Sequence, residues 1–345
     1  MNIPNNPLVS IVILNYNAGD LLLNCISSII KSNYKNFEII LVDNLSHDNS
    51  HKKCVEYFPE IKLVENKKNL GYCEGNNVGI RICKGELIVI LNPDTIVVEN
   101  WLSELISAYK KYGDGFYQPK FLSMENHSIL LSTGQMIQIF GFGFSRSKGD
   151  IDIKQHEKIE KIDYASGTCL LTSMNTMKKI GMFQSFLFAF HDDLELCWRG
   201  RIQGISSYYV PKSIVYHPRE GYSFKWNSLK FKLMERNRKF CLLTLYDRKT
   251  LLKMIPALFL VDMAVSIFYL SKGIIFMKIS ADFEILKNIK LINKIYEQNK
   301  LKKIIPDKVL IQQFKSDISV PKWVVDSRVN NIFSKFLTIL GKFVL

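Results

Sequence analysis

The chain has 345 residues and a formal net charge of +14, from 46 Lys and Arg against 32 Asp and Glu. A hydrophobic fraction of 47% with 12% aromatic residues excludes a disordered or low-complexity chain. Residues 1–218 hold 22 basic and 22 acidic residues, whereas residues 219–345 hold 24 basic and 10 acidic ones, so the whole excess lies in the last part. This split predicts a neutral N-terminal module and a basic C-terminal one with different partners.

The seven cysteines are scattered and form no C-x-x-C pair. This pattern argues against a disulfide framework or a zinc finger and indicates a reducing compartment. The segment Met1–Pro7 is short and polar, with no basic region followed by an apolar run, so we expect no signal peptide.

The first 112 residues alternate between short apolar runs and helical patterns. We expect strands at 8–14, 37–42, 61–65 and 86–91, and helices at 21–31, 50–58, 74–83 and 101–112. This alternation predicts an α/β fold with a mostly parallel sheet, in which ligands bind beyond the carboxyl ends of the strands. Residues 115–165 are less regular, and a helix at 175–180 and one or two strands at 205–217 are expected after them.

Two acidic residues directly follow predicted strands. Asp43 follows the second strand, where a carboxylate can accept a hydrogen bond from a ribose hydroxyl or a base N–H. Asp94 lies in Asn92-Pro93-Asp94-Thr95 after the fourth strand, where a carboxylate suits Mg²⁺ or Mn²⁺ shared with a diphosphate. Each segment could instead be only a turn or a cap, because Asn, Asp and Pro are common turn residues.

A third acidic group is Asp192-Asp193-Leu194-Glu195. Adjacent like charges repel, which raises the pKa of at least one of these carboxyl groups and suits a proton acceptor. The structural alternative is a solvated acidic start of a helix, which the helix dipole favours. His217 ends the last apolar stretch, and with Asp94 it would complete a nitrogen–oxygen site that Mn²⁺ accepts. A lone histidine is nevertheless more often a packed core residue.

The sequence lacks G-x-G-x-x-G, G-x-x-x-x-G-K-[ST] and G-x-S-x-G. These absences disfavour a dinucleotide oxidoreductase, a P-loop NTPase and an α/β-hydrolase.

Six segments, in order, resemble the family 2 glycosyltransferases with a GT-A fold, in particular the rhamnosyltransferase-like branch. They cover roughly the first two-thirds of the chain, and the last of them is similar to the family's E-D-x-D-L-C-x-R motif. The segments are Val9–Asn17, Val42–Asn44, Asn69–Gly79, Leu91–Thr95, Ser166–Leu171 followed by Gly181–Phe183, and Asp192–Arg199.

The resemblance implies an inverting transfer of a sugar from a nucleotide-diphosphate sugar to a hydroxyl of a glycan or a lipid-linked acceptor. It implies a mixed, mostly parallel sheet with helices on both faces over 1–220, followed by a helical region over 221–345. The implied roles are nucleotide binding by Asn15, Asn17, Asp43 and Asn76, binding of Mn²⁺ or Mg²⁺ by Asp94 and His217, general base catalysis by Asp193, and an acceptor site shaped by Asp192, Glu195 and Trp198.

Four positions depart from the family pattern, and one of them, Gln184, stands where the family usually has an acidic residue. Asn92 stands where the D-x-D motif has its first Asp, so one metal contact is expected to be weaker or water-mediated. Asp192 replaces the usual Glu and Glu195 the usual Asp, which shifts the reach of each carboxylate by one methylene.

The resemblance ends where the positive charge begins. The apolar stretch 254–279 is long enough to span ~30 Å of hydrocarbon, but Asp262 near its centre, with Lys272 and Gly273, argues against an ordinary span. We favour an interfacial helix pair on an anionic membrane surface, with the amphipathic segment 332–345 as a second contact. The expected location is cytoplasmic and peripheral, on the inner face of the cell membrane. A soluble helical subdomain or a homodimer interface is the alternative.

Two other functions would use parts of the same sequence. Asn92 motivates a non-catalytic module that binds a sugar nucleotide or a glycan. A nucleic-acid-binding protein would use the basic tail, but it leaves Asp94, Asp193 and His217 without a purpose, so nucleic acid is not an expected partner.

Overall fold

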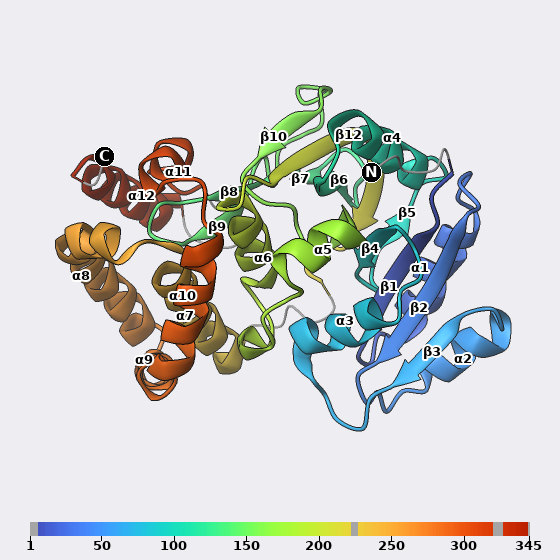
Figure 1. Cartoon of the computed structure of the whole chain (residues 1–345), viewed down its shortest axis with the longest axis horizontal. Coiled ribbons are helices and arrows are strands. Elements are labelled where there is room, and N and C mark those ends of the chain that lie inside the picture. Colours follow the sequence, from blue (N-terminus) through green and yellow to red (C-terminus); the bar gives the residue numbers. More distant parts are fainter. Residues whose placement is uncertain (1–5, 222–226, 320–326, 344–345) are drawn as a thin grey trace. The chain divides into compact units, whose positions relative to one another are not determined.

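The computed structural model describes residues 6–221, 227–319 and 327–343. The chain divides into two compact units (Figure 1). Unit 1 comprises Met1–Gln135, Ser147–Cys197 and Ile205–Lys225, and unit 2 comprises Met136–Arg146, Trp198–Gly204 and Trp226–Leu345. Two short segments of the first two-thirds therefore belong to the same unit as the C-terminal helices.

Unit 1 is built on a ten-stranded sheet in the order β10-β12-β6-β11-β4-β1-β2-β3, with β5 paired to β12 and β7 to β6. Its strands are β1 Val9–Asn15, β2 Phe37–Asp43, β3 Lys62–Glu65, β4 Leu87–Leu91, β5 Ile96–Val97, β6 Gly115–Ser123, β7 Leu130–Ser132, β10 Glu160–Ile162, β11 Cys169–Ser173 and β12 Ser206–His217. Strands β1 to β4 are mutually parallel, and β11 runs antiparallel to both β4 and β6. Because β12 is parallel to β6, the carboxyl ends of β1, β2, β4 and β12 lie at the same edge.

Helices cover both faces of this sheet, as the resemblance implies. Ile11 and Ile13 of β1 share a core with helices on one face, whereas on the other face Gly79 lies so close to Val12 that a Cβ there would stand 2.4 Å from it. A central parallel strand is buried on both sides, which is why β1 is apolar without alternation. The helices are α1 Asp20–Ile30, α2 Ser50–Tyr57, α3 Gly71–Arg81, α4 Trp101–Tyr112, α5 Met174–Ile180, the 3₁₀ turn η1 Ser185–Leu187 and α6 Asp192–Arg201, which ends in unit 2.

The strands and helices predicted for the first 112 residues are all present, with ends that differ by three residues or fewer. The largest shift is in α3, which begins at Gly71 instead of residue 74. The irregular stretch after residue 115 contains a strand that the sequence did not predict, β6, whose nine residues are all buried.

Unit 2 is mainly helical. The predicted apolar stretch 254–279 is two helices, separated at Lys272–Ile274, where Gly273 takes the left-handed conformation with φ 68°. Lys225 and Val344, which belong to the predicted basic and amphipathic segments, lie outside the described residues. The elements are the short strands β8 Gln135–Ile137 and β9 Gly143–Ser145 and the helices α7 Ser228–Leu245, α8 Arg248–Ser271, α9 Ile275–Lys287, α10 Ile289–Lys302, α11 Asp307–Gln313 and α12 Ser327–Lys342. Among the described helices, α8 is the one long and apolar enough to cross a membrane, by length and composition.

Candidate active site

The predicted site residues of unit 1 gather at the carboxyl edge of the sheet. Asn15, Asp43 and His217 are the last residues of β1, β2 and β12, and Asp94 lies in the loop after β4. The segment that leads into β11 reaches the same edge, because the Asn92 N–H donates to the Thr168 carbonyl at 3.0 Å. Strands β1, β2 and β4 are parallel neighbours, so the short loops after them are adjacent.

The Asp43 carboxylate is buried and held from two sides. Its Oδ1 accepts from Asn15 Nδ2 at 2.8 Å, and its Oδ2 accepts from the Ser46 N–H at 2.8 Å. The pairing of β1 with β2 places Asn15 and Asp43 directly opposite each other, which is why these two predicted nucleotide-binding residues meet. A carboxylate oxygen accepts up to two hydrogen bonds, so Oδ2 keeps capacity for a donor on a nucleotide base.

The structure adds His51 to this group, a residue that sequence reasoning missed. Its Nδ1 lies 3.3 Å from Asp43 Oδ1 and its Nε2 lies 3.2 Å from Glu65 Oε1. His51 is on α2, and its only sequence signal is the spacing of eight residues from Asp43, which does not identify a contact.

The other two predicted nucleotide-binding residues have different surroundings. Asn17 is exposed and left-handed, with φ 57°, and its Oδ1 accepts from the His47 N–H at 2.7 Å, which ties the loop after β1 to the loop after β2. Asn76 on α3 is buried, and among the described residues its Oδ1 has no hydrogen-bond partner. Buried polar atoms are normally satisfied, so an orphaned acceptor is what a ligand donor would complete.

Asp94 and His217 lie against each other, as predicted for a metal pair. The distance between Asp94 Oδ1 and His217 Nε2 is 3.4 Å. Strands β4 and β12 are separated by two others, but the chain after Asp94 crosses over to pair as β5 with β12, Val97 opposite Val215. This two-residue pairing brings the loop after β4 to the end of β12.

This pair fits a divalent cation. A carboxylate oxygen and an imidazole nitrogen are the donor set that Mn²⁺ accepts, and Mg²⁺ and Mn²⁺ commonly complete their shell with diphosphate oxygens and water. Gly221 follows β12 and leaves room beside the pair, since a Cβ there would stand 3.2 Å from Asp94 Oδ2.

The acidic pair Asp192-Asp193 begins α6, where the partial positive charge of a helix start favours carboxylates. Asp192 is buried, whereas Asp193 is partly exposed. Asp193 Oδ2 accepts from the Gly167 N–H at 2.9 Å, and its Oδ1 accepts from the Leu194 N–H at 2.8 Å. Of the two carboxylates, Asp193 is therefore the one that a substrate can reach.

The two carboxylates titrate differently. Burial, followed by the charge of Asp193, raises the pKa of Asp192 to about 8. Burial also raises the pKa of Asp193, and the N–H groups of Gly167 and Leu194 oppose that rise. At neutral pH Asp192 accordingly holds a proton and Asp193 is the better proton acceptor of the pair.

Tyr72 is a second residue that sequence reasoning missed. Its hydroxyl donates to the Gly167 carbonyl at 2.7 Å, and the N–H of the same glycine donates to Asp193. Burial and the charges of Asp192 and Asp193 raise the pKa of the Tyr72 phenol, so it stays protonated and able to donate. Tyr72 thus holds Gly167, the residue whose N–H supports the Asp193 carboxylate.

We expect Tyr72→Phe to lower kcat at pH 7 by about two- to tenfold, the effect of one lost hydrogen bond of about 0.5–1.5 kcal/mol. When Gly167 is held less firmly, its N–H stabilises the Asp193 carboxylate less, and the pKa of Asp193 rises further. The acidic limb of the pH–rate profile should therefore move to higher pH. The pH dependence of kcat tests this, and an unshifted profile would show that Tyr72 acts only by packing.

The structure contradicts the prediction that Trp198 lines the acceptor site. Its ring is fully buried in unit 2, with ring centroids 4.9 Å from Tyr246 and 5.0 Å from Phe314, so it is a core residue. The reason is helical geometry: at ~100° per residue, five residues after Asp193 place Trp198 about 140° around the helix. Glu195 is also fully buried, and its part in acceptor binding stays a prediction.

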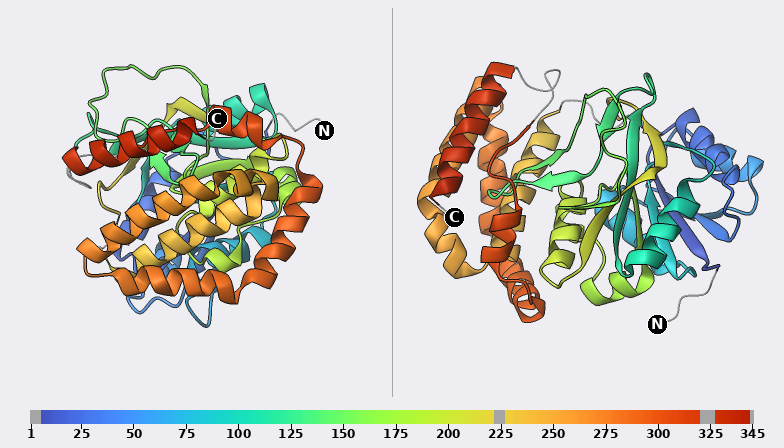
Figure 2. Two further views of the ribbon diagram at one scale, coloured as in Figure 1. Left: turned by 90° about the vertical axis from the view of Figure 1, so that its left-hand side faces the viewer. Right: turned by 90° about the horizontal axis from the view of Figure 1, so that it is seen from above.

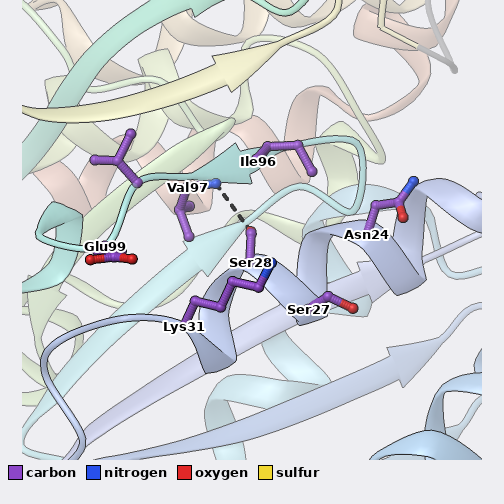
Figure 3. A pocket seen from close by; sticks show the side chains of 8 residues that line it. Asn24, Ser27, Ser28, Lys31, Ile96, Val97 and Glu99 are labelled. Carbon is purple, nitrogen blue, oxygen red and sulfur yellow. Dashed lines mark hydrogen bonds between the residues drawn. The ribbon is translucent and has the colours of Figure 1, made fainter.

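A groove elsewhere in unit 1 holds none of the predicted site residues. It lies between the second half of α1 and β5, where Ser28 Oγ accepts from the Val97 N–H at 3.1 Å (Figure 3). The residues that line it are Asn24, Ser27, Ser28, Lys31, Ile96, Val97, Val98 and Glu99. The two charged residues in this lining, Lys31 and Glu99, are exposed.

Several known proteins are similar to this chain in sequence or fold. The chain is 27% identical over 205 residues to a low-salt glycan biosynthesis hexosyltransferase of Haloferax volcanii, covering 57% of this chain and 63% of that protein. It is 24% identical to an N-acetylglucosaminyl-diphospho-decaprenol L-rhamnosyltransferase of Mycobacterium tuberculosis, covering 61% of this chain and 76% of that protein. A solved structure of GalNAc-T7 with UDP, GalNAc and Mn²⁺ superposes with a TM-score of 0.60 at 18% identity, over 71% of this chain and 49% of that one.

The chain thus spans less than two-thirds of the first of these relatives, and the structural likeness concerns the fold alone. The likeness confirms the predicted GT-A architecture, a mixed and mostly parallel sheet with helices on both faces. Residues 10–181, about half of the chain, match the family model described as glycosyl transferase family 2. The chain therefore belongs to glycosyltransferase family 2.

Proposed function

We propose that this protein is an inverting glycosyltransferase that moves a sugar from a nucleotide-diphosphate sugar to an acceptor hydroxyl. The observation that carries the proposal is the convergence of three groups at one edge of unit 1: Asp43 with Asn15, Asp94 with His217, and the Asp192–Asp193 pair supported by Gly167. Each group matches one requirement of the reaction, namely nucleotide binding, neutralisation of the leaving diphosphate, and deprotonation of the acceptor.

The chain's own residues supply the following steps. Asp43 accepts a hydrogen bond from the nucleotide, and Asp193, which is partly exposed, accepts the proton of the acceptor hydroxyl as that oxygen attacks C1 of the sugar. The C1–oxygen bond to the diphosphate breaks as the new bond forms, which inverts the configuration at C1. A Mn²⁺ or Mg²⁺ ion held by Asp94 and His217 would stabilise the charge on the departing diphosphate.

The acceptor that we propose is a lipid-linked or cell-surface glycan, and the proposed location is the cytoplasmic side of a membrane, through residues 221–345. Support comes from the basic, apolar unit 2 and from the similarity to the N-acetylglucosaminyl-diphospho-decaprenol L-rhamnosyltransferase of Mycobacterium tuberculosis.

Donor binding tests the proposal. A thermal-shift screen of UDP-, dTDP- and GDP-sugars with Mn²⁺ should find one donor that, at about 100 times its dissociation constant, stabilises the protein by about 2.7 kcal/mol. Asp43→Asn should weaken that donor at least about tenfold, because hydrogen bonds to charged groups contribute about 1.5–3 kcal/mol. Asp20→Asn, which alters an exposed carboxylate at the start of α1, is the matched control and should bind normally. Equal binding by both variants would remove Asp43 from the nucleotide site.

A further inference from the structure

One side of α8 carries a continuous apolar stripe. Six large apolar residues recur every three or four positions along the helix, and each is 47–65% exposed. They are Leu252, Ile255, Phe259, Met263, Ile267 and Leu270. The opposite side of the helix, which includes Val261 and Val265, is buried in unit 2. In the left panel of Figure 2 the helix α8 lies toward the viewer, together with α12.

The next helix repeats the pattern. Phe276, Ile279, Phe283 and Leu286 of α9 are 56–75% exposed, whereas the intervening Ala281 is buried. We call these four residues and the six of α8 the α8–α9 apolar surface. Soluble monomers rarely expose so many large apolar side chains on consecutive elements, which marks this surface as a contact site.

The carboxylates of these two helices all point to cations of unit 2. Asp262 lies 2.6 Å from Lys239 Nζ and 2.8 Å from Lys278 Nζ. Asp282 contacts the same two lysines, and Glu284 contacts Lys232 and Arg236. Asp262 and Asp282 form a cluster with Glu235, in which carboxylate oxygens lie within 4.8 Å of one another. Its three negative charges are balanced by Arg238, Lys239 and Lys278, so the cluster needs no metal.

This network disfavours a bilayer span by α8, because it places an ion-paired carboxylate near the middle of the helix. Asp262 is near the middle of the helix, and it is tied to both α7 and α9. Burial alone would raise the pKa of Asp262, but the hydrogen bonds from Lys239 and Lys278 outweigh burial and lower it. The carboxylate therefore stays ionised, and charged groups are strongly disfavoured in the hydrocarbon centre.

The charged residues exposed around the surface are basic. Lys249, Lys253, Lys272, Lys287 and Lys290 are exposed, and none has a carboxylate within ion-pair distance in the described part of the chain. Two copies joined symmetrically through this surface would bring these lysines together without acidic partners. Lipid phosphates supply the missing negative charge, so charge complementarity favours an anionic membrane over a second copy.

We propose that the α8–α9 apolar surface lies in the plane of an anionic membrane, with its side chains at the acyl boundary and the five lysines on the headgroups. This inference rests on the proposed function and sharpens it: α8, which is long enough to span, lies flat, and unit 2 stays on one side of the bilayer.

Depth-dependent quenching distinguishes a flat from a spanning helix, because Phe259 is at the midpoint of α8. The full-length Phe259→Trp variant is bound to vesicles of phosphatidylglycerol and phosphatidylcholine that carry nitroxide labels near the headgroup or near the chain end. After subtraction of wild-type fluorescence, we expect stronger quenching by the shallow label. Stronger quenching by the deep label would overturn the proposal in favour of a span. Leu301→Trp on α10, also exposed, should be quenched by neither label.

Vesicle flotation tests whether a membrane or a second copy of the chain covers the α8–α9 apolar surface. Phe259→Gln with Ile267→Gln should lower flotation at least tenfold and leave binding of UDP- or GDP-sugars unchanged, so failure of the surface is distinguishable from failure of the donor site. The matched control, Leu301→Gln with Ile304→Gln, alters two apolar residues that lie outside the surface and are at least as exposed, and it should float normally. Unchanged flotation by the first pair, with a dimer-to-monomer shift in sedimentation, would overturn the proposal and assign the surface to a second copy.

Discussion

Replacement of Asp193 by asparagine is expected to lower turnover by about 10²–10⁴-fold, the usual contribution of a positioned general base. The amide cannot take the acceptor proton, but it retains the shape of the carboxylate, and its one oxygen can still accept from either the Gly167 N–H or the Leu194 N–H. The fold and the donor site, which use other residues, should be unaffected.

The measurement is the initial rate of sugar transfer with saturating donor, beside the donor dissociation constant of the same preparation. An unchanged dissociation constant separates lost chemistry from lost binding. Transfer at a rate near that of the wild-type protein would show that another group takes the proton.

Asp192→Asn should behave in the opposite way, although the two residues are adjacent. With its pKa raised to about 8, Asp192 is already protonated at neutral pH, and asparagine imitates that neutral state. We expect near-wild-type turnover at pH 7 and no titration near pH 8 in the pH–rate profile. Loss of turnover at pH 7 equal to that of Asp193→Asn would reverse the two assignments.

The same substitution has a large expected effect on stability. The pKa of Asp192 is about 8 in the folded protein against an ordinary value of 3.8, so the folded state binds more protons between these values. The free energy of unfolding must then fall as pH rises through this window, and asparagine removes that loss. Urea denaturation at pH 5 and pH 8 should show that the advantage of Asp192→Asn grows with pH. Parallel stabilities at both pH values would mean that Asp192 is ionised in the folded protein.

Local sequence patterns were sufficient for strands β1 to β4 and for the residues that follow β2 and β4 at the carboxyl edge. Asp43 and Asp94 could be placed because each follows an apolar run, and a parallel strand buried on both faces is readable as such a run. The same reasoning could not show that Asp94 meets His217. That contact depends on β5, a two-residue strand whose pairing with β12 joins segments more than 100 residues apart.

Helix geometry explains the other differences. The resemblance implied that Trp198 shapes the acceptor site, but the rotation along α6 carries its ring into the core of unit 2. The contact of Tyr72 with Gly167 joins residues 95 positions apart, and a tyrosine at a helix start has no sequence signature of that role. The apolar stretch 254–279 was predicted to prefer an interfacial helix pair, and what the sequence could not show was which side chains face outward.

Donor hydrolysis in the absence of acceptor tests the central claim most directly. With Mn²⁺ and a sugar nucleotide that binds, the full-length protein should slowly release nucleoside diphosphate, and Asp94→Ala should lose this release. A donor that binds tightly but is never cleaved, with or without Mn²⁺, would contradict the account and show a binding module instead of an enzyme.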